Sequence, residues 1–448
     1  MSEVIKIKKG LNIPLEGKAE MVFGQAQLPG LFAIKPVDFH GLTPKMVVAE
    51  GDSVKIGSVL FHDKYHPEIK VVSPVSGRVK TINRGERRRI LEVVLENDNK
   101  DESLDFGKSD PATMDREAIV GKLLEGGAWP YLRQRPYDIL ANPSDTPKAI
   151  FVSGFDSSPL APDYDFVLTG QEEAFKVGVE VLKKLAAVVH IGISAESASK
   201  VYNSLQGVTL NSFTGPHPAG NVGVQIHHVS PINKGEKVWV INPQEIVSIG
   251  NLFVQGKHDF SRVIAVTGSE VLKPLYLRYR LGASVVEILK DNIGEGSLRV
   301  ISGNVLTGTN IGTDGYLGFY HSQLCVIPEG DDYEFLGWAS LGFGKFSVSR
   351  SFFSWICKNK KYRLNANLHG SERAIVVSGQ FEKVVPMDIL PEQLIKAILA
   401  EDIDKMEQLG LYEIVEEDIA LCEFVDTSKM ELQAIVRDGI NLMMKELG

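Results

Sequence analysis

Short apolar runs separated by turn-forming residues dominate the first 95 positions and restrict this region to a β fold. Glycine and proline recur every few residues there, and runs rich in valine, leucine and isoleucine lie between them. Two stretches, EGDSVKIGSVL (50–60) and SPVSGRVKTI (73–82), share a design in which tight turns alternate with inward-facing apolar residues. Such patterning is typical of short strands joined by turns. The sequence therefore predicts a flattened sandwich of two similar halves over residues 1–100.

Lys64, in the stretch FHDKYHP, lies at the hairpin expected to join these halves. In biotinyl and lipoyl carrier domains, which residues 1–100 resemble, that hairpin presents the modified lysine, and the fold is called a barrel-sandwich hybrid. Here His66 and Pro67 lengthen the hairpin, and Pro67 constrains its backbone and removes an N–H group. A carrier at Lys64 stays an alternative, and we expect a plain hairpin lysine.

Charge and hydropathy exclude several classes of protein. At 448 residues the chain is long enough for three or four domains. Its formal net charge of −9, without a basic stripe, argues against nucleic-acid binding. The basic cluster at 87–89 is expected to be a solvated hairpin tip.

No run approaches the ~20 apolar residues that cross a bilayer, and the opening MSEVIKIKKG lacks a signal peptide's apolar core. The sequence predicts no transmembrane segment and a cytoplasmic location.

The cysteines give no sign of a metal centre. Cys325, Cys357 and Cys422 are scattered, odd in number and never spaced as CxxC. This argues against a disulfide framework, structural zinc or a four-thiolate cluster, and we expect buried, inert thiols.

A polar linker at 96–115 precedes a second domain, expected over residues 112–258. Strands are predicted in KAIFVSG (148–154), AAVVHIGIS (186–194) and VTLNSF (208–213). One helix is expected between the first two strands, with Phe175, Val179, Leu182 and Ala186 on one face and a capping box of Thr169 and Glu172. A second is expected from Ser194 to Leu205. Alternating strands and helices indicate a parallel, Rossmann-like α/β domain.

The turn after the first of these strands, GFDSSPLAPDYD (154–165), does not favour a dinucleotide. A phosphate-binding turn needs several glycines so that backbone N–H groups can approach the pyrophosphate. This turn has one glycine and three aspartates, which would repel phosphate, and no strand is followed by GxGxxG or GxxxxGK[ST].

Two more domains are expected downstream. Residues 259–325 show a compact α+β pattern with glycine-rich turns, and residues 326–448 form a C-terminal domain ending in amphipathic helices. Ser428 with Glu431 could cap the last helix. The fold class predicted for the whole chain is therefore multidomain, with a β-sandwich, a parallel α/β domain, a small α+β domain and a C-terminal helical domain.

Aromatic and basic residues concentrate in GGAWPYLRQRPYD (126–138). Rigid aromatic rings beside guanidinium groups suit a flat, partly apolar ligand with polar edges, such as a quinone or an isoalloxazine ring. The alternative is that these aromatics only seat one domain on the next, and the sequence leaves both open.

Three histidines, His217, His227 and His228, suggest a metal site at first sight. Neighbours on a strand point to opposite faces, so His227 and His228 could not easily share one ion, and no carboxylate or thiolate stands at a matching spacing. The sequence also contains no nucleophile elbow or HExxH motif, so we predict neither a metal site nor a catalytic residue.

Four motifs, in order along the chain, resemble the NqrA family of the bacterial sodium-translocating NADH:quinone oxidoreductase. They are IKIKKGLNIPLEG, the sandwich stretch from EGDSVKIGSVL to INRGERR, HPAGNVGVQIHHVSPINKGEKVWVINPQ and CEFVDTSKMELQAIVRDGINLMMKE. The resemblance covers nearly the whole chain. It implies a cytoplasmic, membrane-peripheral component of a six-subunit pump that moves Na⁺ while electrons pass from NADH to ubiquinone. The implied partners are ubiquinone and the other five components, NqrB to NqrF, mainly the membrane component NqrB.

The resemblance also implies that this chain binds no redox cofactor itself. FAD, FMN, riboflavin and the iron-sulfur centres belong to other subunits of that complex. Similar chains in the Rnf complex and in complex I carry a GxGGAGFPTG-like loop for flavin and NADH, where this chain has EGGAWPYL with Trp129 in place of a glycine. Those relatives end in cysteine-rich cluster motifs, of which only Cys422 remains. Residues 259–325 resemble their SLBB β-grasp domain.

We therefore expect a quinone-associated subunit without a complete catalytic centre. Any quinone contact is expected in FAIKPVDF (32–39) and in the aromatic stretch. The candidate residues are Phe32, Lys35, Phe39, Trp129, Pro130, Tyr131, Arg133 and Arg135. The alternatives are a soluble flavin-dependent NADH dehydrogenase that uses the α/β domain, and the carrier at Lys64.

Overall fold

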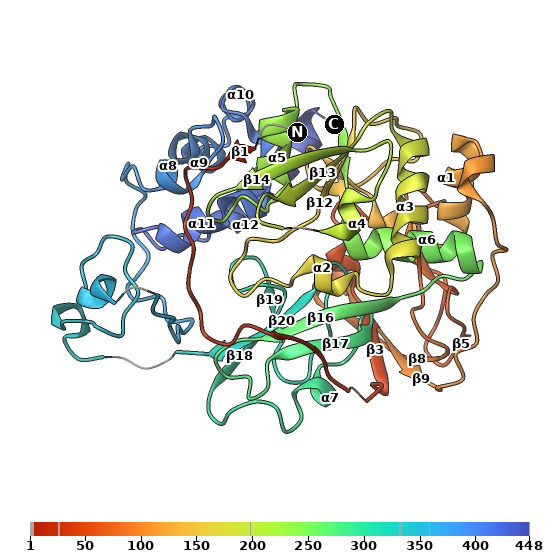
Figure 1. Cartoon of the computed structure of the whole chain (residues 1–448), viewed down its shortest axis with the longest axis horizontal. Helices are drawn as coiled ribbons and strands as arrows, with labels where there is room; N and C mark the ends of the chain where they lie inside the picture. Colours follow the sequence, from red (N-terminus) through yellow and green to blue (C-terminus); the bar gives the residue numbers. More distant parts are fainter. Residues whose placement is uncertain (1–3, 26, 198, 331–333, 358, 448) are drawn as a thin grey trace.

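The computed structural model describes residues 4–25, 27–197, 199–330, 334–357 and 359–447. Figure 1 shows four groups of elements: a β-sandwich, a sheet covered by helices, a second mixed sheet below it, and a cluster of helices near the C-terminus.

The predicted sandwich is present. One sheet has the order β3 (Leu31–Ile34), β9 (Ile90–Asn97), β8 (Gly77–Arg84), β5 (Ser53–Val54), and the other the order β4 (Pro44–Met46), β6 (Val59–Asp63), β7 (Lys70–Val72). Phe61, Val79 and Leu95 are buried in its core. The SPVSG turn needs its glycine: Gly77 has φ +145°, and a Cβ there would lie 1.9 Å from the carbonyl oxygen of Glu96.

The first thirty residues, predicted to lie in the sandwich, instead extend two neighbouring sheets. Strand β1 (Ile5–Lys6) pairs in parallel with β14 (Thr209–Thr214) of the α/β sheet, and β2 (Glu20–Phe23) pairs with β17 (Leu275–Arg280) of the mixed sheet. Figure 1 shows the connecting chain running between the two sheets. A short apolar run predicts a strand but not the strand with which it pairs.

The α/β domain has a seven-stranded sheet with a parallel centre. Its order is β1, β14 (Thr209–Thr214), β13 (Val189–Ser194), β12 (Ile150–Ser153), β15 (Val238–Val240), β10 (Arg133–Arg135), β11 (Ile139–Leu140). The parallel strands confirm the prediction, whereas the antiparallel pairing of β10 with β15 was missed. Residues 133–135 of the aromatic stretch are thereby a strand of this sheet, next to its edge strand β11.

The described part of this domain contains the helices α1 (Arg116–Glu125), α3 (Glu172–Leu185), α5 (Val222–Val229) and α6 (Pro243–Gln255) and the short helices α2 (Tyr164–Val167) and α4 (Lys200–Asn203). Helices α3 and α6 touch through glycines. A Cβ on Gly178 would lie 2.1 Å from the carbonyl oxygen of Ile246, and one on Gly250 would lie 1.8 Å from that of Ala174.

Three local predictions in this domain were wrong. Helix α3 begins after Gln171 without a capping box, because the Glu172 carboxylate accepts from the Gly170 N–H at 3.0 Å and leaves Thr169 outside. The helix expected from Ser194 to Leu205 shrinks to α4. His227 and His228 lie on helix α5 and not on a strand.

The small third domain forms a mixed sheet with the order β19 (Thr309–Asn310), β18 (Leu298–Ser302), β20 (Gln323–Pro328), β16 (Ser261–Thr267), β17 (Leu275–Arg280), β2, with α7 (Val286–Leu289) beside it. The tail contains α8 (Phe381–Val384), α9 (Pro391–Leu399), α10 (Ile403–Gln408), α11 (Glu416–Val425) and α12 (Leu432–Leu447). The predicted helical tail is confirmed. Its apolar faces pack on Ile7, Ile13 and Phe213, so the tail shares a core with the α/β domain.

The predicted cap on the last helix is not present. The Ser428 hydroxyl donates to the carbonyl oxygen of Ala374 at 3.3 Å, and the backbone N–H of Gln433 donates to the Glu423 carboxylate at 2.9 Å. The Glu423 side chain of helix α11 therefore accepts a hydrogen bond from a backbone N–H in the first turn of α12.

Cys325 and Cys422 are buried, as expected, but Cys357 is exposed and corrects that prediction. Among the residues that the structure describes, no cluster of three or more His, Cys, Asp or Glu side chains is arranged to hold a metal. The helices of the described ranges include none with the length and apolarity to cross a membrane.

Candidate functional site

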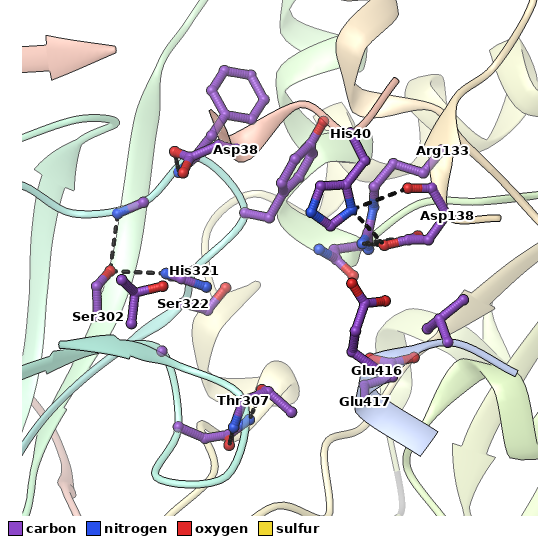
Figure 2. Close-up of a pocket in the computed structure, with 18 of the residues that line it drawn as sticks. Asp38, His40, Arg133, Asp138, Ser302, Thr307, His321, Ser322, Glu416 and Glu417 are labelled. Atoms are coloured by element: carbon purple, nitrogen blue, oxygen red, sulfur yellow. Dashed lines mark hydrogen bonds and ion pairs between the residues drawn. The ribbon is translucent and has the colours of Figure 1, made fainter. Parts of the chain in front are cut away.

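A cavity of about 570 Å³ lies where the sandwich, the α/β sheet, the third domain and the C-terminal helices meet. Figure 2 shows side chains from all four parts converging on it. Its lining residues are Lys35, Val37, Asp38, His40, Arg133, Asp138, Ile139, Leu140, Asp156, Pro162, Tyr164, Asn242, Ser302, Gly303, Asn304, Thr307, Thr309, residues 318–323 and 415–417, Gln433, Ala434 and Arg437. The cavity therefore forms only when these four parts of the chain are folded together.

The sandwich contributes one wall through Lys35, Asp38 and His40. The Lys35 ammonium donates to the carbonyl oxygen of Tyr316 at 2.9 Å, and the Asp38 carboxylate accepts from the backbone N–H of Phe319 at 2.9 Å. Burial raises the pKa of Asp38 even though Lys35 opposes that shift. These contacts fix the turn after β3 against the third domain.

Strand β10 contributes Arg133 to the opposite wall. Its guanidinium lies 3.3 Å from both carboxylate oxygens of Asp138 and 4.8 Å above the ring of Tyr320. Burial alone would raise the pKa of Asp138, but Arg133, His40 and Arg135 together lower it, so this carboxylate is ionised. The guanidinium is thereby held in place by an ion pair and a ring face.

The third domain supplies a hydrogen-bonded group around Ser302. The Ser302 hydroxyl contacts Nδ1 of His321 at 2.8 Å and accepts from the Gly318 N–H at 2.9 Å. Burial lowers the pKa of His321 to about 4, so the imidazole is neutral. The Tyr320 hydroxyl donates to the carbonyl oxygen of Pro130 at 2.7 Å and connects this wall to the aromatic stretch.

Helix α11 closes the cavity with two carboxylates. Glu416 pairs with Arg437 of α12, and Glu417 accepts from Arg135 of β10 at 2.6 Å. Arg135 also donates to Asp418 at 3.1 Å, and its side chain is only 2% exposed. A buried ionic network thus ties the C-terminal helices to the edge of the α/β sheet.

The charges of the lining disfavour an anionic ligand. The lining carries the cations Lys35, Arg133 and Arg437 and the carboxylates Asp38, Asp138, Asp156, Glu416 and Glu417. Two of the three cations are already paired with carboxylates. Val37, Ile139, Leu140 and Phe319 add apolar surface. Such a cavity suits an uncharged ligand with an apolar body and a few hydrogen-bonding groups.

Of the eight predicted quinone residues, the structure places Lys35 and Arg133 on the cavity wall. The other six are buried and do not line the cavity: Phe32, Phe39, Trp129, Pro130, Tyr131 and Arg135. Phe39 and Tyr131 pack on Phe319 with ring centroids 4.6 and 5.5 Å away, so they support the wall. Quinone binding itself stays a prediction.

Trp129 is a packing residue. It is fully buried, its Nε1 donates to the carbonyl oxygen of Ala141 at 2.7 Å, and it meets Trp239 edge to face at 5.5 Å. These contacts lie within the α/β domain, whereas Tyr131 of the same stretch packs on Phe319 of the third domain. The neighbouring Gly127 has φ +67°, and a Cβ there would lie 2.6 Å from Val72.

Several lining groups were missed from the sequence. His40, His321 and Tyr320 stand in HGL and in GFYHSQ, where a histidine beside an aromatic or a glycine is a weak signal. Glu416 and Glu417 carry no signal at all, because only the fold brings α11 to β10. Asp138 lies within the aromatic stretch and could have been paired with Arg133.

The rings of His227 and His228 meet edge to face with centroids 5.2 Å apart, but the three histidines singled out in the sequence have different hydrogen-bond partners. His217 contacts the Ser157 hydroxyl at 3.0 Å, His227 contacts Glu413 at 2.9 Å, and His228 contacts the carbonyl oxygen of Val224 at 2.9 Å. Lys64 is exposed on the hairpin between β6 and β7, as expected, and its backbone N–H donates to Thr43.

Three family models match this chain in sequence. The NqrA N-terminal barrel-sandwich hybrid domain matches residues 5–98, the NqrA second alpha/beta domain matches 114–258, and the NQRA C-terminal domain matches 263–312. The expected order of sandwich, α/β domain and SLBB domain is confirmed.

Curated relatives match over their whole length. The NqrA protein of the Na(+)-translocating NADH-quinone reductase of Serratia proteamaculans is 41% identical over 449 residues, covering 99% of this chain and 100% of the relative. The proteins of the same name from Pseudomonas aeruginosa and Saccharophagus degradans are 40% and 38% identical, with the same coverage.

Among solved structures, the chain is similar to a NAD+-reducing [NiFe]-hydrogenase in its air-oxidized and H2-reduced states. The TM-scores are 0.38 and 0.40 and the identities 12% and 13%, and the match covers about three quarters of this chain and 62% of that one. A likeness this distant carries no argument about function. The family models and the full-length relatives agree with each other, and the chain belongs to the NqrA family of Na(+)-translocating NADH-quinone reductase subunits.

Proposed function

We propose that this chain is the peripheral, cytoplasmic NqrA component of a sodium-translocating NADH:ubiquinone reductase and that its interdomain cavity receives the ubiquinone headgroup. Its full-length relatives carry the name of that component. In this proposal the chain docks on the membrane component NqrB, and the FAD, FMN, riboflavin and iron-sulfur centres reside in other subunits.

The observation that carries the quinone proposal is the chemistry of the cavity lining. A quinone headgroup is flat and uncharged, and its carbonyl oxygens only accept hydrogen bonds. The cavity combines apolar side chains with the donors Lys35 and Arg133 on different walls. Its excess of carboxylates would repel the phosphates of a dinucleotide but not a quinone.

The chain's own contribution is to bind and orient the headgroup. Charged donors hold a carbonyl oxygen more strongly than neutral ones do. Reduction of a quinone also consumes two protons. The titratable side chain of His40 lines the cavity, and its Nδ1 lies 3.2 Å from the carbonyl oxygen of Asp138. In this proposal the electrons come from the cofactors of neighbouring subunits, and this chain has no complete catalytic centre.

The packing of the aromatic stretch favours a chain without its own flavin over a flavin-dependent dehydrogenase. Trp129 stands where the resemblance implies a glycine of a flavin loop, and its side chain is fully buried. Flavin released in stoichiometric amount from the purified chain would instead support the dehydrogenase.

The proposal is tested by Lys35→Met and Arg133→Gln in the assembled complex. Each change removes a charged donor, for which the loss is roughly 1.5–3 kcal/mol, so KM for ubiquinone should rise about tenfold or more. Oxidation of NADH by an artificial electron acceptor should be unchanged.

The matched control is Arg78→Gln, whose guanidinium pairs with Glu96 on the exposed face of the sandwich. It should behave as the unmodified complex. Ubiquinone kinetics and inhibitor sensitivity that are unchanged in both cavity variants, with normal assembly, would refute the assignment.

A further inference from the structure

A segment at the start of the C-terminal domain exposes an unusual number of large apolar side chains. We define the aromatic–basic segment as residues 334–357 and 359–363. Phe335 is 91% exposed, Trp338 80% and Trp355 53%. Figure 1 shows this part of the chain projecting to one side of the body. Single exposed apolar residues are ordinary, but a contiguous set marks a contact surface.

The same segment is basic in an otherwise acidic protein. It contains five basic residues and one acidic residue, whereas the whole chain carries a net charge of −9. Lys345 pairs with Glu334, and Arg363 pairs with Glu270. Within the described ranges, the remaining cations Arg350, Lys360 and Lys361 make no ion pair with a carboxylate.

The unpaired cations line a groove of about 440 Å³ between the segment and the N-terminal chain. Its lining also includes Leu11 and Phe346, so it has both apolar and positively charged surface. The Arg350 guanidinium lies 6.0 Å from the ring centroid of Trp355. Aromatic and cationic groups thus occupy the same face.

From these features we propose that the aromatic–basic segment is a membrane-contacting surface. Its exposed aromatic side chains enter the headgroup region of a bilayer that contains anionic phospholipid, and the groove receives a lipid phosphate between Arg350, Lys360 and Lys361. This role is separate from quinone binding and from docking on a membrane protein of the complex.

The composition favours lipid over protein as the partner. Tryptophan concentrates at membrane interfaces, and lysine and arginine close to the surface are attracted to anionic lipid. Lysine is depleted at protein–protein interfaces, yet three of the five basic residues here are lysines.

The purified full chain offers a direct optical test. Of its four tryptophans, Trp129 and Trp239 are fully buried, whereas Trp338 and Trp355 are exposed on the segment. Brominated lipids in vesicles of phosphatidylcholine and phosphatidylglycerol should therefore quench only the segment's fluorescence. Strong quenching with anionic vesicles and little with pure phosphatidylcholine is the expected result.

Two sets of variants test whether the cations and the exposed aromatic side chains of the segment bind the membrane. Binding is measured by vesicle flotation. Removing three charges with R350Q/K360Q/K361Q should weaken partitioning about a hundredfold, at ~1 kcal/mol per charge. F335S/W338S, which keeps Trp355 as a reporter, should weaken it at least about tenfold.

The chain provides matched controls on other surfaces. R87Q/R88Q/R89Q removes three exposed charges from the hairpin tip, and Y65S/L272S removes two exposed apolar side chains. Both should float as the unmodified chain does.

Three outcomes of the vesicle experiments would overturn the proposal. They are no quenching or flotation with anionic vesicles, equal binding to pure phosphatidylcholine, or equal weakening by the hairpin control. Protection of Cys357, which is exposed on the segment, by delipidated membrane proteins of the complex but not by vesicles would show a protein partner instead.

Discussion

Replacing Arg135 with methionine should destabilise the contact between the C-terminal helices and the α/β sheet. Arg135 donates to Glu417 at 2.6 Å and to Asp418 at 3.1 Å. Glu417 is 35% exposed and can be rehydrated, whereas the Asp418 side chain is fully buried. The variant therefore leaves the buried Asp418 carboxylate without its cation. Removing one partner of a buried ion pair lowers the free energy of unfolding by about 3–5 kcal/mol.

The size of this loss should depend on pH. Burial and the neighbouring Glu417 raise the pKa of Asp418 to about 7, although Arg135 opposes the shift. Because the folded-state pKa is raised, the stability that the neutral carboxyl contributes is fully present below the unfolded value of about 3.9. It is lost as pH rises through 7. Without Arg135 the pKa rises further, so at pH 5.5 the variant should lose only about 1–2 kcal/mol.

The loss in free energy of unfolding at each pH is measured by urea unfolding at pH 8.5 and pH 5.5. The transition to follow is the one in which the C-terminal helices unfold. The double variant R135M/D418L removes both charges and should lie close to the unmodified chain. Arg78→Met, an exposed ion-pair partner, should cost less than about 1 kcal/mol. A loss for R135M that is the same at both pH values, or below about 1 kcal/mol, would refute the reasoning.

Three further predictions concern packing and surface chemistry. Gly178→Ala should destabilise the chain by at least about 2 kcal/mol in the same unfolding assay, because its Cβ would lie 2.1 Å from a carbonyl oxygen of α6. Gly121→Ala, on the open face of α1, should stabilise the chain by about 0.5–1 kcal/mol. Equal changes in stability for the two variants would contradict the close contact between α3 and α6. A thiol reagent should label Cys357 rapidly in the native chain, with the two buried cysteines reacting only after unfolding. The intact mass should equal that of the bare sequence, whereas an added biotinyl or lipoyl group on Lys64 would establish the carrier alternative.

The sequence predicted the parts of the fold that rest on local patterns. The paired stretches around Gly57 and Gly77 indicated the sandwich, and the alternation between 148 and 213 indicated the parallel sheet. The pairing of two strands could not be predicted, because Ile5–Lys6 and Arg133–Arg135 pair with strands far away in the chain. Helix starts were wrong where a carboxylate from elsewhere, such as Glu423, replaced the expected cap.

The candidate site was only partly predictable for a related reason. Lys35 and Arg133 stood out by composition and line the cavity, but the aromatic rings beside them are buried behind its wall. Those rings were conspicuous because they are large, and large rings are the usual material of a domain interface. Glu416 and His321 reach the cavity only through tertiary packing, which no local spacing encodes.

The central claim is that ubiquinone is held in the cavity of this chain. A structure of the assembled complex with a bound quinone analogue tests it most directly. We predict the headgroup within hydrogen-bonding reach of Lys35 and Arg133 and beside the ring of Tyr320. A headgroup surrounded only by other proteins of the complex, with this cavity empty, would contradict it.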